Sequence, residues 1–300
     1  MEGFDCTLCP RRCGVPRGTG RVGLCGMPDR VRVAMAMLHR WEEPVISGDG
    51  GSGAVFFSGC NLRCSFCQNA PISHDGQGRE VTTAQLRQIF ETLVAQGAEN
   101  IDLITATHFV PWILPALEPK LPVPVAYNCG GYESMVTLKL LEGKVDIYLP
   151  DLKYADNRLA RQLSGAGDYF QVATAAIREM FRQVGPPVIQ DGILRRGVVV
   201  RHLILPGCVE NSLRVLDWLG ENFAPGEVLV SLMRQYTPMG EAAKTPPFDR
   251  KVTDEEYDAV LSWMYLNDLE GFVQEDSAAG EECIPKWEEW DLERFLGAKR

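Results

Sequence analysis

Three cysteines fall within eight residues, directly after a short apolar run. Cys60, Cys64 and Cys67 follow residues 54–58, which read as a β-strand ending at a glycine. Three thiolates can bind one face of an iron–sulfur cluster, but a 4Fe–4S cluster held wholly by protein needs four cysteines. The spacing therefore predicts a cluster with one iron left open to an outside ligand. The alternative is a zinc site completed by a distant residue.

A second group of cysteines lies near the start of the chain. Cys6, Cys9 and Cys13 are separated by two and three residues, and Cys25 follows after eleven more. Four thiolates make a closed site, and either zinc or an auxiliary 4Fe–4S cluster would suit them. The surrounding glycines favour a tight loop around a metal, and four free thiols in a glycine-rich arm are the alternative. Because seven of the ten cysteines lie in the first 67 residues, a disulfide framework is not expected.

Charged side chains also occur where strands are expected to end. Asp151 and Lys153 follow a strand predicted at residues 145–149, and Arg201 lies inside the largely apolar segment 198–205. Parallel βα proteins place their chemistry in the loops after the carboxyl ends of strands, so Asp151 and Lys153 are candidate site residues. An ordinary ion pair at the rim is the alternative. A buried guanidinium needs an anionic partner, and Asp151 is one candidate for Arg201.

Strands and helices that would position these residues alternate along the chain. Helices are predicted between a capping box at Thr82 and a stop at Gly97, and at residues 134–142, 157–184 (in two pieces), 211–222 and 253–267. The strands lack polar alternation, which is typical of a parallel sheet buried on both faces; they are residues 54–58, 101–105, 123–127, 145–149, 198–205 and 227–233. The alternation favours a right-handed βα fold, either an open doubly wound sheet or a full or partial barrel. Further short strands are predicted at residues 31–38 and 272–274.

The cysteine triad and its surroundings resemble the radical SAM superfamily. The triad has the spacing Cys-x3-Cys-x2-Cys with an aromatic residue, Phe66, before the last cysteine. Residues 53–68 (GAVFFSGCNLRCSFCQ) resemble the branch of pyruvate formate-lyase activating enzyme-like proteins. The likeness runs from about residue 4 through most of the chain and includes residues 6–13 (CTLCPRRC), 41–44 (WEEP), 128–132 (NCGGY), 146–153 (DIYLPDLK), 201–207 (RHLILPG) and 235–239 (QYTPM).

This resemblance implies a partial (β/α)6 barrel and a particular chemistry. Cys60, Cys64 and Cys67 would bind three irons of a 4Fe–4S cluster, and S-adenosylmethionine would chelate the fourth. Reduction would cleave S-adenosylmethionine to a 5′-deoxyadenosyl radical, which abstracts hydrogen from a substrate. The partner implied is a low-potential electron donor of the flavodoxin or ferredoxin type. The substrate is left open between a glycine of a partner protein, another protein residue and a small molecule.

The resemblance also assigns cofactor-binding roles, with one departure. Similar enzymes line the site with Asp-Leu-Lys, which matches Asp151 and Lys153, and Arg201 could meet the cofactor carboxylate. Asn128, at the third strand's end, could contact ribose or carboxylate. The usual Gly-Gly-Glu after the second strand, which grips the cofactor's ammonium, is replaced here by residues 105–108. The polar contact would then come from Thr105, Thr107 or His108.

Composition and charge exclude several classes of protein. The chain has 300 residues and a net charge of -10, which argues against a general nucleic-acid surface. It has no apolar run long enough for a membrane span and no apolar leader, so a cytoplasmic protein is expected.

Three regions are predicted: a Cys-rich metal-binding module at 1–50, a barrel at 51–240 and a C-terminal helix and tail at 241–300. Trp287 and Trp290 are expected to pack over the barrel, and Cys283 is assigned to neither cysteine set. A non-enzymatic iron–sulfur or zinc protein is the competing class.

Overall fold

A computed structural model describes residues 4–274, Trp287 and residues 291–296. Its centre is a sheet in which seven neighbouring strands run parallel, and the expected partial barrel of mixed α/β type is confirmed. In sheet order the parallel strands are β2 (Ser52–Phe57), β4 (Ile101–Ile104), β5 (Val125–Cys129), β6 (Ile147–Pro150), β8 (Ile193–Leu203), β9 (Leu229–Met233) and β10 (Gly271–Val273). The six predicted strands of the βα alternation are all present.

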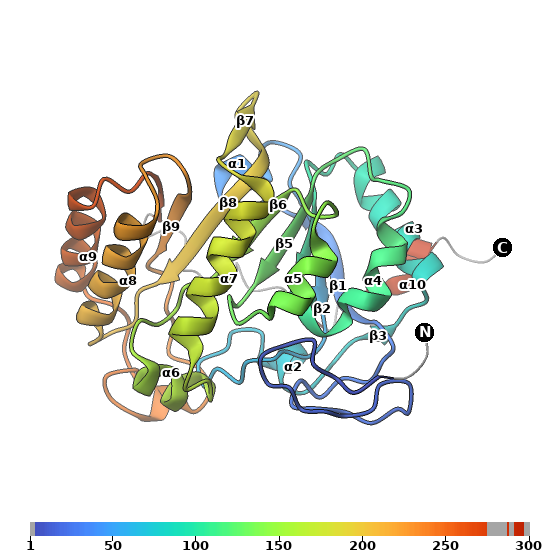
Figure 1. The fold of residues 1–300 in the computed structure, drawn as a ribbon, viewed down its shortest axis with the longest axis horizontal. Helices are drawn as coiled ribbons and strands as arrows, with labels where there is room; N and C mark the ends of the chain where they lie inside the picture. Colours follow the sequence, from blue (N-terminus) through green and yellow to red (C-terminus); the bar gives the residue numbers. More distant parts are fainter. Residues whose placement is uncertain (1–3, 275–286, 288–290, 297–300) are drawn as a thin grey trace.

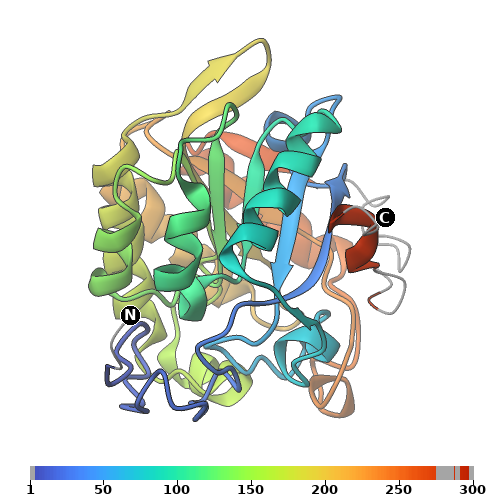
Figure 2. The same ribbon diagram turned by 90° about the vertical axis from the view of Figure 1, so that its right-hand side faces the viewer.

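Helices cover the outer face of this sheet (Figures 1 and 2). Two of them begin where the sequence predicts, because the side chains of Thr82 and Thr253 form capping boxes with Gln85 and Glu256. The segment 157–184 is two helices, as expected. The main helices are α3 (Thr83–Ala95), α5 (Met135–Leu141), α6 (Asn157–Ser164), α7 (Tyr169–Val184), α8 (Val209–Asn222) and α9 (Asp254–Leu266); shorter ones are α2 (Ala70–Ser73), α4 (Val110–Ile113) and α10 (Leu292–Leu296).

A short helix packs on the inner face of the sheet, opposite the helices that cover the outer face. The short helix α1 (Pro44–Ser47) carries Ile46, which is fully buried against the inner side chains of several strands. Those side chains include Ala126, Ile147, Leu149 and Val199. Burial of a side chain the size of Ile46 contributes about 2 kcal/mol to the stability of the fold, so α1 is held firmly against the inner face of the barrel.

Residues 32–47 are part of the barrel, although they lie within the region predicted as a separate module at residues 1–50. The strand predicted at residues 31–38 is β1 (Arg32–His39), and it pairs antiparallel with β2. A two-residue strand, β3 (Arg79–Glu80), then extends the sheet beyond β1. Figures 1 and 2 show the N-terminal segment before β1, residues 4–31, outside the sheet and close to α2.

Two local differences from the predicted strands have clear causes. β5 starts at Val125 and not at residue 123 because Pro124 has no N–H to donate. β8 starts five residues early because it forms a hairpin with β7 (Val188–Gln190), which was not predicted. The turn is Asp191-Gly192, and both residues have positive φ, as a type I′ turn requires.

The described part of the C-terminal tail is short. The ring of Trp287 is buried and lies edge-on to Phe56 on the inner face, 5.2 Å between ring centroids, so it packs on the barrel as predicted. Trp290 and Cys283 lie outside the described residues. Among the described residues, no helix combines the length and apolar character needed to cross a bilayer.

Candidate active site

The loop of Cys60, Cys64 and Cys67 follows β2 and is pressed against the N-terminal segment. Gly59 opens it at φ +80°, a conformation that favours glycine. A Cβ on Gly59 would lie 2.3 Å from Met27 Cγ and 2.7 Å from the Cys25 carbonyl oxygen. Only glycine therefore allows the loop to leave the strand at this point.

Each sulfur of the triad has a hydrogen-bonding neighbour. The backbone N–H of Leu62 donates to Cys60 Sγ at 3.3 Å, and the Ser164 hydroxyl donates to Cys64 Sγ at 3.0 Å. Cys67 Sγ lies 3.2 Å from the Ser73 hydroxyl. Hydrogen bonds to ligand sulfurs are among the contacts that tune iron–sulfur clusters.

The chemistry of these thiols fits a cluster. Burial raises the pKa of Cys64 to about 11, and it also raises the pKa of Cys60. Buried thiolates need positive charge close by, and bound iron supplies it. Lys153 adds a cation whose charge acts on both thiols. The donor set, the burial and the hydrogen bonds suit a cluster with one iron open.

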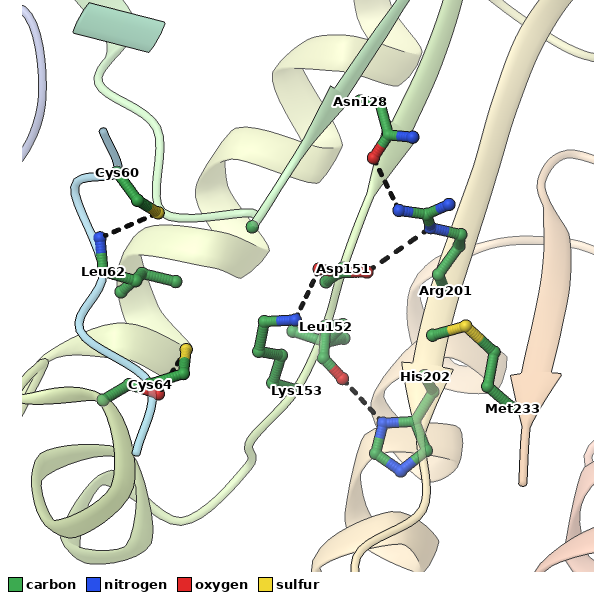
Figure 3. Close-up of polar contacts among 12 residues, drawn as sticks. Cys60, Leu62, Cys64, Asn128, Asp151, Leu152, Lys153, Arg201, His202 and Met233 are labelled. Atoms are coloured by element: carbon green, nitrogen blue, oxygen red, sulfur yellow. Dashed lines mark hydrogen bonds and ion pairs between the residues drawn. The ribbon is translucent and has the colours of Figure 1, made fainter. Parts of the chain in front are cut away.

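A row of charged side chains leads from this loop along the inner face of the sheet (Figure 3). Lys153 Nζ lies 2.5 Å from Asp151 Oδ2, and Arg201 Nε lies 3.4 Å from Asp151 Oδ1. Asp151 is backbone-bridged to Arg201, so both side chains leave the sheet at the same level. Arg201 Nη2 also donates to Asn128 Oδ1 at 2.5 Å. The structure thus gathers four of the predicted residues: Asn128, Asp151, Lys153 and Arg201.

The charges of this row stabilise one another. Burial alone would raise the pKa of Asp151, but the charges of Lys153 and Arg201 outweigh burial and hold it below its ordinary value. Burial would likewise lower the pKa of Lys153, but the carboxylate of Asp151 keeps it raised. Asp151 and Lys153 are therefore an ion pair at neutral pH.

Arg201 has the anionic partner that the sequence analysis required, and a second one. Besides Asp151 it meets Glu42, whose Oε2 lies 3.0 Å from Arg201 Nη1. Glu42 was not singled out as a site residue. Asp102, which is fully buried on β4 and bonded to Asn128 at 3.1 Å, was missed as well. A charge inside an apolar strand was the signal that drew attention to Arg201, and Asp102 carries the same signal.

Residues 105–108 are distributed between two faces. Thr105 ends β4 at φ +61°, a strained conformation for a β-branched residue, and its N–H donates to the Asn128 carbonyl at 2.8 Å. Thr107 points to the helix side, where its hydroxyl donates to Glu133 at 2.7 Å. His108 is buried, with Nε2 2.7 Å from the Ser58 carbonyl oxygen, and burial lowers its pKa to about 4. Thr107 and His108 thus support neighbouring loops, and Thr105 lies next to Asn128.

The second cysteine set lies in the N-terminal segment. Cys6, Cys9 and Cys25 are buried and Cys13 is exposed. Burial raises the pKa of Cys9 to about 12, and the neighbouring thiols Cys25 and Cys6 add to this shift. In the described part of the chain, no three Cys, His, Asp or Glu side chains already converge on a single ion position. Zinc or iron–sulfur binding by this set is therefore a prediction from residue type and proximity.

The N-terminal segment is fastened to the mouth of the barrel. Arg11 Nε donates to the Asn61 carbonyl at 2.9 Å, inside the triad loop, and its Nη2 donates to the Ser164 carbonyl at 3.1 Å. Arg17 is almost fully buried; its guanidinium lies 4.8 Å from the Trp112 ring centroid and donates to the His108 carbonyl at 2.6 Å. These contacts place the second cysteine set beside the first.

The sequence profile of the radical SAM superfamily matches residues 54–219, more than half of the chain. The chain belongs to this superfamily, which implies a 4Fe–4S cluster and S-adenosylmethionine as cofactors.

Curated proteins similar to it include the following two. One is the uncharacterized protein MJ0674 of Methanocaldococcus jannaschii, 28% identical over 270 residues, or 86% of this chain and 73% of that protein. The other is a pyruvate formate-lyase-activating enzyme of Clostridium pasteurianum, 24% identical over 178 residues, or 53% of this chain and 72% of that enzyme. The relation to the activating enzyme is distant.

Solved structures that share the fold include the following two. Streptococcus suis SuiB bound to precursor peptide SuiA has a TM-score of 0.51 and 15% identity over 78% of this chain and 51% of that chain. HydG, a maturase of the [FeFe]-hydrogenase, has a TM-score of 0.51 and 14% identity over 75% of this chain and 52% of that chain. The chain spans about half the length of these structures, and the likeness concerns the fold alone.

Proposed function

We propose that Cys60, Cys64 and Cys67 hold the cluster, and that Asp151, Lys153, Arg201 and Asn128 bind S-adenosylmethionine and orient a substrate beside it. The observation that carries this proposal is the row of ion pairs from Lys153 through Asp151 to Arg201, with the charge of Lys153 acting on the thiols of Cys60 and Cys64. When bound, the cofactors supply an electron and a 5′-deoxyadenosyl radical that abstracts hydrogen from the substrate.

The protein's own groups have distinct tasks in this proposal. Lys153 offers an ammonium beside the thiols and close to any carboxylate bound there, while Asp151 fixes its direction. Arg201 is held from two sides by Asp151 and Glu42, which makes it a rigid donor fork. Thr105, directly after β4, and the second amide hydrogen of Asn128, which already donates one to Asp102, are the polar groups that would meet the cofactor's amino or ribose groups.

The test is reductive cleavage of S-adenosylmethionine. Protein reconstituted anaerobically with iron and sulfide should form 5′-deoxyadenosine with dithionite, and Lys153→Met should bind S-adenosylmethionine about tenfold more weakly at unchanged iron content. Lys120→Met is the matched control, because its ammonium pairs with Asp146 at the surface. No 5′-deoxyadenosine from fully loaded protein would refute the proposal.

A glycine of a partner protein is the more specific substrate that we propose for this site. The distant similarity to the activating enzyme of Clostridium pasteurianum supports it. A glycyl radical enzyme from the organism that produces the protein described here should be incubated with the reduced protein and S-adenosylmethionine. It should acquire a glycyl radical signal in electron paramagnetic resonance. Formation of 5′-deoxyadenosine without that signal would contradict a glycine substrate and indicate another one.

The electron donor is proposed to be of the flavodoxin or ferredoxin type, since enzymes of this superfamily need a reductant. Exposed Arg12 and Arg21 flank the second cysteine set and give that surface a positive charge. An acidic donor would be attracted there. Arg12→Glu/Arg21→Glu should slow reduction by flavodoxin and leave reduction by dithionite unchanged; equal slowing of both would contradict docking at this surface.

A further inference from the structure

Several buried polar atoms on the inner face of the barrel lack a hydrogen-bond partner. They include Asp102 Oδ1, Glu43 Oε2 and His39 Nδ1, and all three residues lie near Arg201 and act on it or are acted on by it electrostatically. A buried polar group without a hydrogen-bond partner destabilises the folded protein. Several such groups at one place indicate a ligand that supplies the missing partners.

Asp102 shows most clearly that the partner is missing. Its side chain is fully buried, and only Oδ2 is engaged, by the Asn128 amide at 3.1 Å. In the neighbouring strands the residues in register with it are Ala54 and Ala126, whose methyl groups offer no polar contact. The free oxygen of Asp102 therefore faces the barrel interior without a donor.

Two carboxyl groups near Arg201 have no cation of their own. Direct ion pairs join Arg201 to Glu42 and Asp151, and Lys153 to Asp151, so these two cations and two carboxylates balance. Asp102 and Glu43 also lie within reach of the charge of Arg201 but form no direct ion pair with it. Burial, followed by the charge of Glu42, raises the pKa of Asp102 to about 8, and burial raises the pKa of Glu43 as well. Both carboxyls therefore hold a proton until a cation approaches and takes its place.

An organic cation fits these two carboxyls better than a metal ion. A metal ion needs several ligands at one point, and among the described residues the unpaired carboxyl oxygens here are two, Asp102 Oδ1 and Glu43 Oε2. Two residues further along the same pair of strands from Ala54 and Asp102, Phe56 pairs with Ile104 and packs with it in an apolar cluster that includes Trp287. Such a cluster suits the hydrocarbon part of an amine or a guanidine.

We propose that Asp102 and Glu43 bind an ammonium or guanidinium group of the substrate, with its hydrocarbon part against Phe56 and Ile104. This inference deepens the proposed function and rests on it for the hydrogen abstraction that follows. The same cation could be carried by a free amine or by a Lys or Arg side chain of a peptide. The row of Arg201, Asp151 and Lys153 runs from this group to a cation whose charge acts on the triad thiols, so a substrate anchored here would lie on the side of the cofactor.

Binding to the reconstituted enzyme with S-adenosylmethionine tests the proposal by calorimetry. Agmatine and 1,5-diaminopentane should bind at least about tenfold more tightly than 1,5-pentanediol, which has similar length and no charge. Asp102→Asn, which keeps the size of the side chain, should abolish that preference. Glu118→Gln, at an exposed ion pair with Lys144, should retain it. Binding of tripeptides that contain Arg or Lys is then compared with binding of a tripeptide that contains Gln in the same position. Tighter binding of the Arg or Lys tripeptides would show that a peptide can present the cation.

Equal binding of the diol and the cations, or an unchanged preference in Asp102→Asn, would overturn the proposal. Should Asp102→Asn fail to fold, Glu43→Gln takes its place, and loss of the preference is again the expected result. The readout is separate from that of the proposed function. Cation preference with no 5′-deoxyadenosine formation would reject the radical chemistry alone, and 5′-deoxyadenosine formation without cation preference would reject this inference alone.

Discussion

Arg201 Nη1 lies 3.0 Å from Glu42 Oε2, which joins β8 to the segment leading into α1 across 159 positions of sequence. Arg201 is held on its other side by Asp151. The guanidinium thus connects the segment before α1, the sheet and the charged pair Asp151 and Lys153.

Removal of Arg201 should destabilise the fold. Arg201→Met leaves Glu42 without its buried cation and Asp151 with Lys153 alone, which costs about 3–5 kcal/mol. Urea unfolding of the two proteins measures the difference in free energy of unfolding. Arg158→Met is the control, because Arg158 is exposed and should change stability by less than about 0.5 kcal/mol. A loss below about 1 kcal/mol for Arg201→Met would show that the pair is not a buried one.

The triad should account for one complete cluster. Cys60→Ala should lose iron and the visible charge-transfer absorbance of that cluster, whereas Cys208→Ala, outside both cysteine sets, should retain them. Iron and zinc counts on Cys60→Ala/Cys64→Ala/Cys67→Ala protein then identify the metal at Cys6, Cys9, Cys13 and Cys25. Absence of any metal in that triple variant would contradict a second metal site.

A side chain at Gly59 should separate the N-terminal segment from the barrel. Gly59→Ala places a methyl group 2.7 Å from the Cys25 carbonyl oxygen in addition to the strain of a positive φ. Gly14→Ala has comparable strain at φ +63° with nothing within 4 Å, so it isolates the clash. We expect a loss of about 1 kcal/mol for Gly14→Ala and at least about 2 kcal/mol for Gly59→Ala. Faster proteolysis of the N-terminal segment in Gly59→Ala would confirm the separation, and equal losses would refute it.

Stability should fall on acidification in part through His202. Burial lowers its pKa to about 4, while Nδ1 contacts the Leu152 carbonyl at 2.7 Å and Nε2 contacts the Ser212 hydroxyl at 2.8 Å. The unfolded chain, with a pKa near 6.5, binds the proton first. The contribution of neutral His202 is therefore complete above about pH 6.5 and is lost as pH falls toward 4.

Unfolding at pH 7.5, 6.5 and 5.5 measures this contribution. The difference in unfolding free energy between the native protein and His202→Gln should be constant above pH 7. Below about pH 6.5 it should shrink by up to about 1.4 kcal/mol per pH unit. A difference that does not vary with pH would mean that His202 is not held neutral.

Local features of the sequence were sufficient to predict most elements. The capping boxes at Thr82 and Thr253, and the absence of polar alternation in the strands, depend on neighbouring residues alone. The spacing of Cys60, Cys64 and Cys67 is equally local, and that spacing was sufficient to predict a cluster with one open iron. The β7–β8 hairpin had a local signal as well, since Asp191-Gly192 is a typical type I′ turn.

The assembly of the site was decided by tertiary structure. The sequence showed that Arg201 needs an anion, but strand register brings Asp151 and Asn128 to it, and the packing of α1 brings Glu42. The same packing places β1 and α1 in the barrel, although the cysteine composition suggested a boundary at residue 50. Local chemistry therefore determined which residues could act, and long-range pairing decided which of them meet, because contacts between distant segments depend on register and burial that no local pattern encodes.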